Sequence, residues 1–494
     1  MRKTLVFFLA VIVLTSCTGN GGRNFKDVKD LNEEGIVVGT LIGSLNVDRI
    51  GKDMPKAEMK AYDNDVDALM ALTSGKIDAV ATDGFSYSQM AGDYPELTVF
   101  EDKWHADKLG MIFNKKETEL RTHFNQFLAI LRKDGSLKRI IDRWLSSSNT
   151  VSMPDLKGIP RKGEPIIAVT TGTATATSFM KKDELCGYDI EIMQRFAAYE
   201  KRPIEFLTVN FGGLLAAVSS GKADMGANAI TITKERAKQV DFSDPYFISY
   251  SILVTRCADV AGYKAKTNGS EKSFIGDIVT SFKKNLITED RWKILMDGLW
   301  QTLLITIFAI IIGTLIAAGV SWMSLCKKRW IRSTAHAYIS LLEGIPILVL
   351  LMLIFYVVFA SVGISPTIVA IVTFSMNFGA YMSETFTSTI QGIDRGQKEA
   401  GVAIGFTESQ TFLYIILPQM VQRLMPTYRG RCVSLLKDTS IVGYIAILDL
   451  TKASDIIRSR TFEAFFSLII ITIIYFVLAW LLSKVLGLIN TTKK

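Results

Sequence analysis

Long stretches without charge are confined to the second half of the chain. Residues 24–297 alternate charged and apolar positions in the manner of a water-soluble protein, whereas residues 298–488 hold several long apolar runs. A helix of about 20 apolar residues crosses the hydrocarbon core of a membrane. Four runs are predicted to do so, namely residues 298–326, 335–360, 366–382 and 464–483. The pattern therefore predicts a soluble half followed by a membrane half.

A short sequence repeat lies inside the soluble half. In residues 68–78 and again in residues 214–224, apolar positions at helical spacing lead to a Ser-Gly-Lys stop and then to a short apolar segment. Other strand candidates alternate with helices, at residues 35–40, 109–114, 165–170 and 252–255. This alternation predicts two α/β lobes with a ligand cleft between them. One α/β domain with a chance repeat is the alternative.

The amino terminus has the pattern of a secretory signal. Met1-Arg2-Lys3 is followed by an apolar run over residues 5–14, which ends in Leu-Thr-Ser-Cys17. This ending resembles the lipobox of bacterial lipoproteins, so residues 1–17 are expected to form a lipoprotein signal peptide with Cys17 as the acylated residue. An uncleaved anchor helix is the alternative. Either interpretation places the chain from residue 24 onward outside the cytoplasm.

Charge supports this orientation. The formal net charge is +8, which the positive-inside rule of membrane proteins explains without a nucleic-acid partner. Four basic residues between positions 327 and 332 follow the first predicted span, whereas the connection at 361–365 has none. The first connection is therefore expected to be cytoplasmic. Cys186 and Cys257 would then share the oxidising compartment, and the sequence leaves open whether they pair.

Specific motifs in the soluble half resemble a known family. Gly187-Tyr-Asp-Ile-Glu-Ile-Met, Phe211-Gly-Gly-Leu-Leu and the run from Ile230 to Tyr246 are similar to the first lobe of periplasmic polar amino-acid-binding proteins of type II. The first lobe would then span residues 163–256. Residues 26–145 resemble the second lobe plus the closing helix. Because the family has its first lobe first, the resemblance implies a circular permutation.

A free amino acid presents a carboxylate and an ammonium, and both need partners in a partly dry cleft. Arginine suits the carboxylate because its planar fork donates two parallel hydrogen bonds. Arg236 comes three residues after Thr233, a predicted helix N-cap. The resemblance implies that Arg236 and Thr231 hold the ligand carboxylate beside the backbone of Ala229. An ordinary helix start with a solvated arginine is the alternative.

The resemblance implies three further ligand contacts. Asp83 would accept the ligand ammonium, although a helix cap at a strand end is the alternative. Ser44 matches a position that reaches the carboxylate, and Phe211 matches an aromatic residue that packs on the ligand. Where relatives carry acidic and aromatic residues, residues 170–178 read Thr-Thr-Gly-Thr-Ala-Thr-Ala-Thr-Ser. This uncharged segment favours glutamine or a small polar amino acid over a cation.

A second family resemblance covers the membrane half. Glu399-Ala-Gly-Val-Ala-Ile-Gly405, followed by Ile416-Leu-Pro418, resembles the EAA loop of ATP-binding-cassette importer permeases. The resemblance implies a permease domain at 294–490 after a linker at 257–293, with the EAA loop at 395–420. It also implies a fifth span at 433–448, so the fold class is a two-lobed α/β domain followed by an all-α bundle of about five transmembrane helices. Four residues would couple the loop to the ATPase, namely Glu399, Ala400, Gly401 and Gly405.

Motifs for intrinsic catalysis are missing from the sequence. No Gly-rich phosphate loop ends in Gly-Lys-Ser/Thr, and the three histidines have no paired-ligand spacing. No catalytic residue, metal or cofactor is therefore expected, and a separate ATPase subunit would drive transport. The expected assembly is a homodimer through the permease domain in the bacterial inner membrane, importing a polar amino acid. A membrane-bound amino-acid sensor or ligand-gated channel is the competing function.

Overall fold

The computed structural model describes residues 23–145, 151–156, 158–174, 177–181, 184–261, 279–360, 362–461 and 463–491. Residue contacts divide the chain into two compact units. One unit holds residues up to Asp107 together with the stretch from Ile248, and the other holds Lys108–Phe247 together with the remainder from Lys272. The predicted acylation site, Cys17, lies outside the described residues. Cys186 and Cys257 are free thiols.

The first unit is built on a five-stranded sheet in the order β2-β1-β3-β13-β4. Its strands are β1 Val37–Leu41, β2 Glu58–Tyr62, β3 Ala79–Asp83, β4 Leu97–Leu109 and β13 Phe247–Arg256. Its helices are η1 Val28–Leu31, α2 Asn46–Asp53, α3 Asp65–Thr73, α4 Gly84–Met90, η2 Ala91–Asp93 and η5 Cys257–Asp259. The central strands β1 and β3 are parallel and almost wholly buried, as expected of strands covered on both faces.

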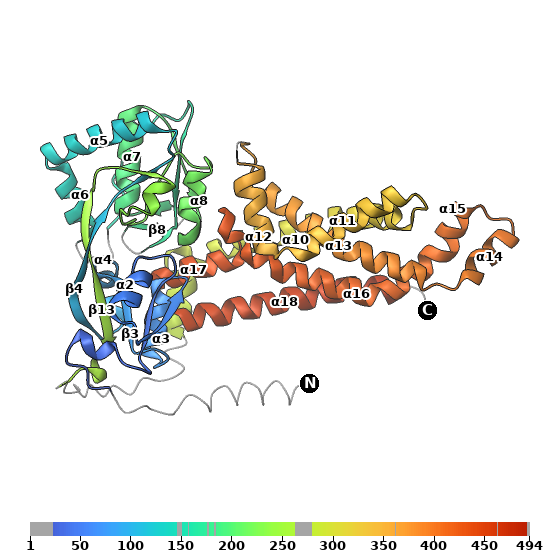
Figure 1. Cartoon of the computed structure of the whole chain (residues 1–494), viewed down its shortest axis with the longest axis horizontal. Coiled ribbons are helices and arrows are strands. Elements are labelled where there is room, and N and C mark those ends of the chain that lie inside the picture. Colours follow the sequence, from blue (N-terminus) through green and yellow to red (C-terminus); the bar gives the residue numbers. More distant parts are fainter. Residues whose placement is uncertain are drawn as a thin grey trace. The chain divides into compact units, whose positions relative to one another are not determined.

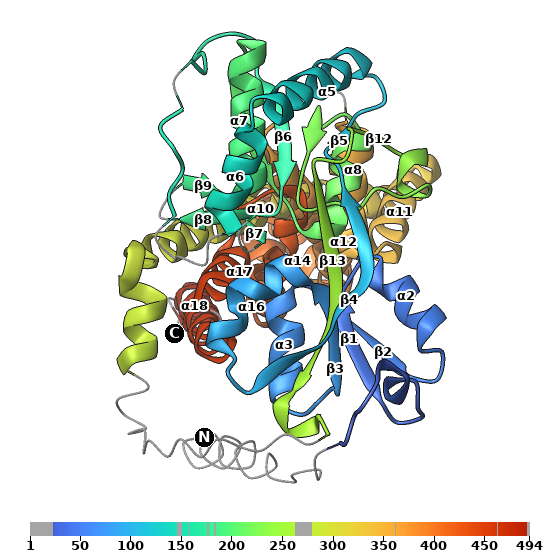
Figure 2. The same ribbon diagram turned by 90° about the vertical axis from the view of Figure 1, so that its left-hand side faces the viewer.

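The second unit contains a sheet of the same design, in the order β10-β6-β11-β5-β12. Figure 2 labels its strands β5, β6 and β12. Its strands are β5 Ile112–Phe113, β6 Ile166–Thr170, β10 Ile204–Thr208, β11 Met225–Gly226 and β12 Asp241–Phe242. A small antiparallel sheet joins β7 Thr173–Ala174, β8 Ser178–Lys181 and β9 Glu184–Cys186. The helices are α5 Thr118–Lys133, α6 Ser136–Leu145, α7 Tyr188–Glu200, η3 Phe211–Gly213, α8 Leu214–Ser219 and η4 Arg236–Lys238.

The two five-stranded sheets confirm the predicted repeat and the two-lobed α/β fold. In each, a helix leads through a glycine with positive φ into a buried strand, at Gly75 (φ 73°) between α3 and β3 and at Gly221 (φ 80°) between α8 and β11. A left-handed backbone favours glycine because it lacks a Cβ. Helices α5 and α6 belong to the same unit as α7, and the predicted lobe boundaries stay predictions.

The remainder of the second unit is a helical bundle (Figure 1). Its elements are η6 Lys283–Ile287, η7 Thr288–Asp290, α10 Trp292–Leu325, α11 Arg329–Gly344, α12 Ile347–Leu353, η8 Ile354–Val358, α13 Pro366–Gln391, α14 Arg395–Ala403, α15 Glu408–Thr411, η9 Phe412–Ile416, α16 Leu417–Asp438, η10 Thr439–Ile445, α17 Leu450–Thr461 and α18 Ala464–Thr491. Helices α10 and α13 approach closely at two glycines. A Cβ on Gly313 would lie only 2.8 Å from Phe378, and a Cβ on Gly379 would lie only 2.6 Å from Ile316. Small residues permit such contacts between membrane helices.

Among the described residues, two helices are long and apolar enough to cross a membrane, α10 and the part of α18 from Phe466 to Leu488. Helix α11 and residues Ile347–Val358 form a third candidate, bent by 104°. Helix α13 contains the predicted span 366–382, but it is not among the helices that meet these criteria of length and hydropathy. The predicted span at 433–448 is wrong, because α16 ends at Asp438, η10 follows, and Ala446 adopts a left-handed φ of 63°. The left-handed Ala446 ends this helical segment, so residues 433–448 do not form one α-helix.

Candidate ligand-binding and coupling sites

The predicted carboxylate-binding residues Thr231 and Arg236 lie together in one turn. The Arg236 amide donates a hydrogen bond to Thr233 Oγ1 at 3.1 Å, so Thr233 caps this turn as predicted. The Arg236 guanidinium donates to the carbonyl of Thr231 at 2.9 Å, and Thr231 is bridged to Leu109. Helix η4, which follows, has only three residues. The guanidinium is therefore held by its own turn, close to Thr231.

Ala229 is fixed by a buried carboxylate that sequence reasoning missed. Ala229 has a φ of +49°, and its amide donates to Asp189 Oδ2 at 3.0 Å. The Tyr246 hydroxyl donates to Asp189 Oδ1 at 2.7 Å. Asp189 is completely buried, and burial raises its pKa to about 6. The position of Asp189 between apolar residues of its motif was the available signal.

Glu191 from the same motif anchors the closing helix α6. Trp144 Nε1 donates to Glu191 Oε2 at 2.8 Å, and Arg195 Nε donates to Glu191 Oε1 at 2.9 Å. Arg143 adds a third donor to this fully buried carboxylate. A buried charge is stable only when it is paired and hydrogen-bonded, as this one is. Two motifs that are distant in sequence therefore meet at one ion cluster, which has a structural role.

Phe211 begins the short helix η3 and is half-buried against the core of its unit. In the uncharged segment at residues 170–178, two threonine hydroxyls donate hydrogen bonds within the protein. Thr170 Oγ1 donates to Ser178 Oγ at 2.6 Å, and Thr171 Oγ1 donates to Asn228 Oδ1 at 2.9 Å. The buried Thr177 hydroxyl has no partner among the described residues. No charged side chain belongs to this hydroxyl cluster.

Asp83 and Ser44 lie in the other unit, at the ends of the adjacent strands β3 and β1. Asp83 caps α4, because its Oδ1 accepts hydrogen bonds from the amides of Phe85 and Ser86, each at 3.0 Å. Its Oδ2 accepts a hydrogen bond from the Ser249 hydroxyl. Burial raises the pKa of Asp83 to about 6. The helix-cap alternative is thus realised, and the ammonium-binding role stays a prediction.

Ser44 contacts Thr40, with 3.2 Å between their hydroxyl oxygens, and it lies two residues before α2. Helix α2 contributes Arg49, which makes a bidentate ion pair with the buried Asp107 at 2.7 and 2.9 Å. The same guanidinium donates to Ser251 Oγ at 2.8 Å. Arg49 therefore joins α2 to strands β4 and β13. The helix that follows Ser44 has a rigid attachment within its unit.

The predicted EAA loop forms a helical hairpin, α14 and α15, at one end of the bundle (Figure 1). Gly401 is buried, and a Cβ there would lie 2.5 Å from Thr411 Cγ2. Gly405 has a φ of +93°, which confirms the predicted glycine turn. Glu399 and Ala400 are exposed. The hairpin also exposes apolar side chains, which we call the hairpin patch: Val402, Ile404, Phe412, Leu413 and Tyr414.

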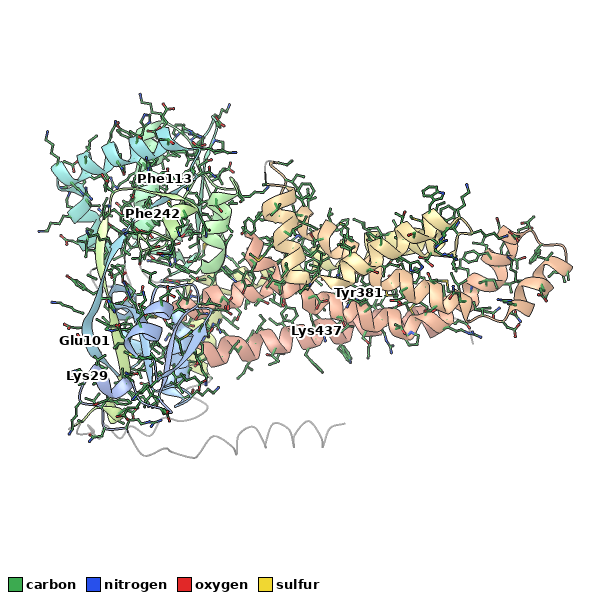
Figure 3. The ribbon with its side chains drawn as sticks, in the orientation of Figure 1. Lys29, Glu101, Phe113, Phe242, Tyr381 and Lys437 are labelled. Atoms are coloured by element: carbon green, nitrogen blue, oxygen red, sulfur yellow. The ribbon has the colours of Figure 1, made fainter. Side chains whose placement is uncertain are left out.

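Charged residues also lie inside the bundle. Arg431 on α16 donates to Asn377 Oδ1 at 3.0 Å, and its guanidinium lies 4.0 Å from the ring centre of Tyr381. Figure 3 labels Tyr381 and, on α16, Lys437. The same figure labels Phe113 and Phe242, which belong to the neighbouring strands β5 and β12 of the sheet. Such charges are costly in a membrane unless they face partners or a cavity. Arg431 has its partners on α13.

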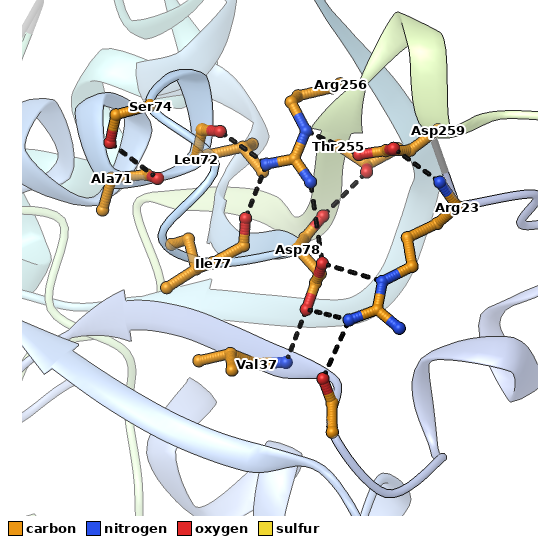
Figure 4. A network of polar contacts seen from close by, with 11 residues as sticks. Arg23, Val37, Ala71, Leu72, Ser74, Ile77, Asp78, Thr255, Arg256 and Asp259 are labelled. Carbon is orange, nitrogen blue, oxygen red and sulfur yellow. Dashed lines mark hydrogen bonds and ion pairs between the residues drawn. The ribbon is translucent and has the colours of Figure 1, made fainter. Parts of the chain in front are cut away.

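An ion network closes the base of the first unit (Figure 4). Asp78 accepts hydrogen bonds from Arg23 Nε at 3.2 Å and from the Val37 amide at 2.9 Å. Arg256 pairs with Asp259 at 2.6 Å and lies 3.6 Å from Asp78. The Arg23 amide also donates to Asp259 Oδ1 at 2.8 Å. The start of the described chain is thereby attached to the end of β13.

Comparison with known proteins supports both halves. The family model for bacterial extracellular solute-binding proteins, family 3, matches residues 166–425, which is more than half of the 494 residues. The match begins at the first residue of β6 and extends into α16, and residues 26–145 lie outside it, so the permuted order stays a prediction.

Three curated permeases are similar to about a third of the chain. A putative glutamine transport system permease protein GlnP of Rickettsia bellii is 30% identical over 184 residues, covering 37% of this chain and 84% of that protein. The L-cystine transport system permease protein TcyB of Bacillus subtilis is 34% identical, covering 36% and 76%. The histidine/lysine/arginine/ornithine permease protein HisQ of Salmonella typhimurium is 32% identical, covering 37% and 83%.

One solved structure is similar at the same level. A crystal structure of an amino acid ABC transporter with histidines shares 30% sequence identity with the chain, with a TM-score of 0.38. The similarity covers 45% of this chain and 99% of that chain.

Proposed function

Because the chain belongs both to the bacterial extracellular solute-binding proteins of family 3 and to the polar amino-acid permeases of ATP-binding-cassette importers, we propose that it captures a polar amino acid and passes it through its own permease domain. The observation that carries this proposal is the presence in one chain of a two-lobed α/β domain and a helical bundle with an EAA-type hairpin. ATP hydrolysis is the task of a separate subunit.

The capture step is assigned to residues of both lobes. Arg236 and Thr231 would bind the carboxylate with the backbone of Ala229, Phe211 would pack on the ligand, and Ser44 and Asp83 would contribute from the second lobe. The uncharged hydroxyl cluster at residues 170–178 supports a neutral ligand, and glutamine is the first candidate. Since the pKa of Asp83 is about 6, its carboxylate is ionised at neutral pH and able to attract an ammonium group.

The coupling step is assigned to the α14–α15 hairpin. Its hairpin patch exposes 71% of Ile404 and 63% of Tyr414, and an apolar surface of this kind indicates a protein partner. We assign the separate ATPase as that partner, with Glu399, Ala400, Gly401 and Gly405 in the docking segment. The chain would work as a homodimer in the bacterial inner membrane, with its binding domain outside and Cys17 acylated.

Replacing Arg236 tests the capture step. In the full chain reconstituted in nanodiscs, Arg236→Ala should weaken amino-acid binding by about 10- to 100-fold, since a hydrogen bond to a charged group contributes about 1.5–3 kcal/mol. Binding of each of the twenty amino acids is measured by calorimetry, with L-glutamine first. Arg139→Ala removes an exposed arginine from the same unit and should leave binding unchanged. Equal affinities for the parent and Arg236→Ala would refute the assignment.

A further inference from the structure

A buried lysine of the bundle reaches the turn that carries Phe211. Lys452 on α17 is only 3% exposed. Its ammonium donates hydrogen bonds to Asn210 Oδ1 at 3.0 Å and to the carbonyl of Val209 at 3.4 Å. Both acceptors directly precede Phe211, and all of these residues belong to the same compact unit. A buried ammonium needs such acceptors to offset its desolvation.

The base of Lys452 is held rigidly. Asp449 accepts hydrogen bonds from the amides of Thr451 at 2.9 Å and Lys452 at 3.0 Å, and so it caps the start of α17. Asp449 and Asp455 are the acidic groups that act electrostatically on the lysine. The Lys452 side chain also packs on Gly443. A Cβ added to Gly443 would lie 3.7 Å from Cβ and Cδ of Lys452. Little movement of the lysine relative to α17 is therefore possible.

The start of α17 is in turn fixed to α10, a predicted membrane span. The Leu450 amide donates to Thr302 Oγ1 at 3.2 Å. A Cβ on Gly298 would lie 2.7 Å from the Asp449 carbonyl oxygen, so only glycine permits this approach. Helix α17 lies at the opposite end of the bundle from α14 and α15 (Figure 1). A continuous set of contacts thus leads from the Phe211 turn to α10.

A second lysine joins the same lobe to the bundle. The Lys222 ammonium donates to the carbonyl of Val362 at 2.8 Å and lies 5.1 Å from the ring centre of Phe355. This lysine is only partly exposed, and its acceptor is in a loop. It therefore holds the lobe without connecting to the capped start of α17. Lys452 is almost fully buried, and its two acceptors directly precede the predicted ligand-contacting residue.

We propose that Lys452 is a positioning residue, which transmits the position of the Phe211 turn through α17 to the outer end of α10. The proposal rests on the proposed function, because it assumes that Phe211 contacts the amino acid. Ligand-dependent movement of the turn would pull on Lys452, and the Asp449 cap would pass that movement to α10. The contact lies within one chain, so each lobe of this kind signals to its own permease domain.

The first test measures ATP hydrolysis by the full chain with its ATPase in nanodiscs, with and without an equimolar mixture of the twenty amino acids. Lys452→Met should reduce the amino-acid stimulation by about tenfold, the factor that one charge-assisted hydrogen bond supplies. Basal hydrolysis and the affinity for the ligand should change little. Lys452→Arg should restore most of the stimulation. Lys293→Met, at a half-exposed lysine of α10, is the matched control.

A double-mutant cycle makes the test specific to the contact. Asn210→Asp places a carboxylate against Lys452 and should preserve stimulation in the parent. In the Lys452→Met background the same change leaves a carboxylate without its cation and should lower stimulation further. Additive effects of the two changes would overturn the proposal, because residues in direct contact are coupled.

Hydrogen exchange separates this inference from the proposed function. Without ligand or ATPase, the amides of residues 207–215 should exchange about tenfold faster in Lys452→Met than in the parent or Lys293→Met. Unchanged exchange would overturn the inference even if transport is normal. If the parent shows no stimulation by any amino acid, the proposed function fails, and the exchange result alone decides whether Lys452 holds the turn.

Discussion

Asp189 illustrates how a buried acidic residue can shape a binding site without touching the ligand. Its carboxylate holds the Ala229 amide and the Tyr246 hydroxyl, and it thereby fixes the left-handed backbone that leads into Thr231. Burial raises its pKa from 3.8 to about 6. The ionised form is therefore less favourable in the folded state than in the unfolded chain.

The raised pKa predicts a defined pH dependence. Because the folded state binds the proton of Asp189 more tightly, its contribution to the free energy of unfolding is greatest below about pH 4 and is lost as the pH rises to about 6. The full effect is about 3 kcal/mol. Asp189→Asn should remove this dependence. Melting temperatures at pH 4 and pH 7 will measure it, with the exposed Asp142→Asn as control. Parallel curves for the parent and Asp189→Asn would contradict the prediction.

At the residue scale, sequence predicts residue types better than their partners. The cap at Thr233 and the glycine turn at Gly405 could be predicted because each depends on neighbours in the chain. The partners of Asp189 could not, since Ala229 and Tyr246 are 40 and 57 positions away. Tertiary contacts of this kind leave no local signal beyond a polar residue among apolar ones.

Among the elements, the α14–α15 hairpin depends on one close approach. Gly401 lies against Thr411, and a Cβ at position 401 would be 2.5 Å from Thr411 Cγ2 and 2.8 Å from its Oγ1. The Thr411 hydroxyl is buried and has no hydrogen-bond partner among the described residues. The resemblance to the EAA loop implies an alanine at position 401, where this chain has glycine. The glycine here is thus matched to the threonine opposite.

This pairing predicts a reversible defect. Gly401→Ala should destabilise the hairpin by about 1–3 kcal/mol through overpacking. Faster amide exchange over residues 395–416 and weaker coupling to ATP hydrolysis should follow, with ligand binding unchanged. Thr411→Ala should rescue Gly401→Ala, because it removes both crowded atoms. Gly430→Ala, where no neighbouring atom lies within 4 Å, is the control. A fully coupled Gly401→Ala variant would show that the hairpin tolerates the extra methyl group.

Element boundaries show why periodicity alone was insufficient in the bundle. The spans at 298–326 and 464–483 could be predicted because their apolar runs are long. Helix α10 covers the first as far as Leu325, and α18 contains the second. The apolar pattern at 433–448 is only moderate, and the family resemblance alone predicts a span there. The charged pair Lys437-Asp438 marks the end of α16 instead. Helix η10 continues from α16 to Ile445, and α17 begins at Leu450 after the left-handed Ala446.

For the whole molecule, fusion changes how often the binding domain meets its permease. A linker converts diffusional encounter into an effective concentration in the millimolar range. Two attachments are expected here, the acyl chain on Cys17 and the segment that leads from β13 to the bundle. Either one would keep the domain at the membrane surface.

The two attachments predict a conditional effect of cutting the chain. With a protease site inserted between residues 264 and 276, cleavage in proteoliposomes should largely preserve amino-acid uptake, because the acyl chain retains the domain. In the Cys17→Ala background the same cut should leave the domain held only by noncovalent contacts and reduce uptake by at least about 100-fold. Uptake of radiolabelled amino acid before and after cleavage is the measurement. Loss of uptake after cleavage of the acylated parent would contradict the prediction.

The ion network around Asp78 gives these attachments a common origin. Arg23 and Phe25 are bound to Asp259 and Ala261 around a parallel bridge between Phe25 and Val260, so the incoming and outgoing segments of the chain meet at one place on the unit. Two attachments that start from one place on a domain restrict its rotation less than two attachments that start from distant places. The backbone hydrogen bonds of Phe25 with residues 259 and 261 should keep the two attachments together even in an Asp259→Ala variant.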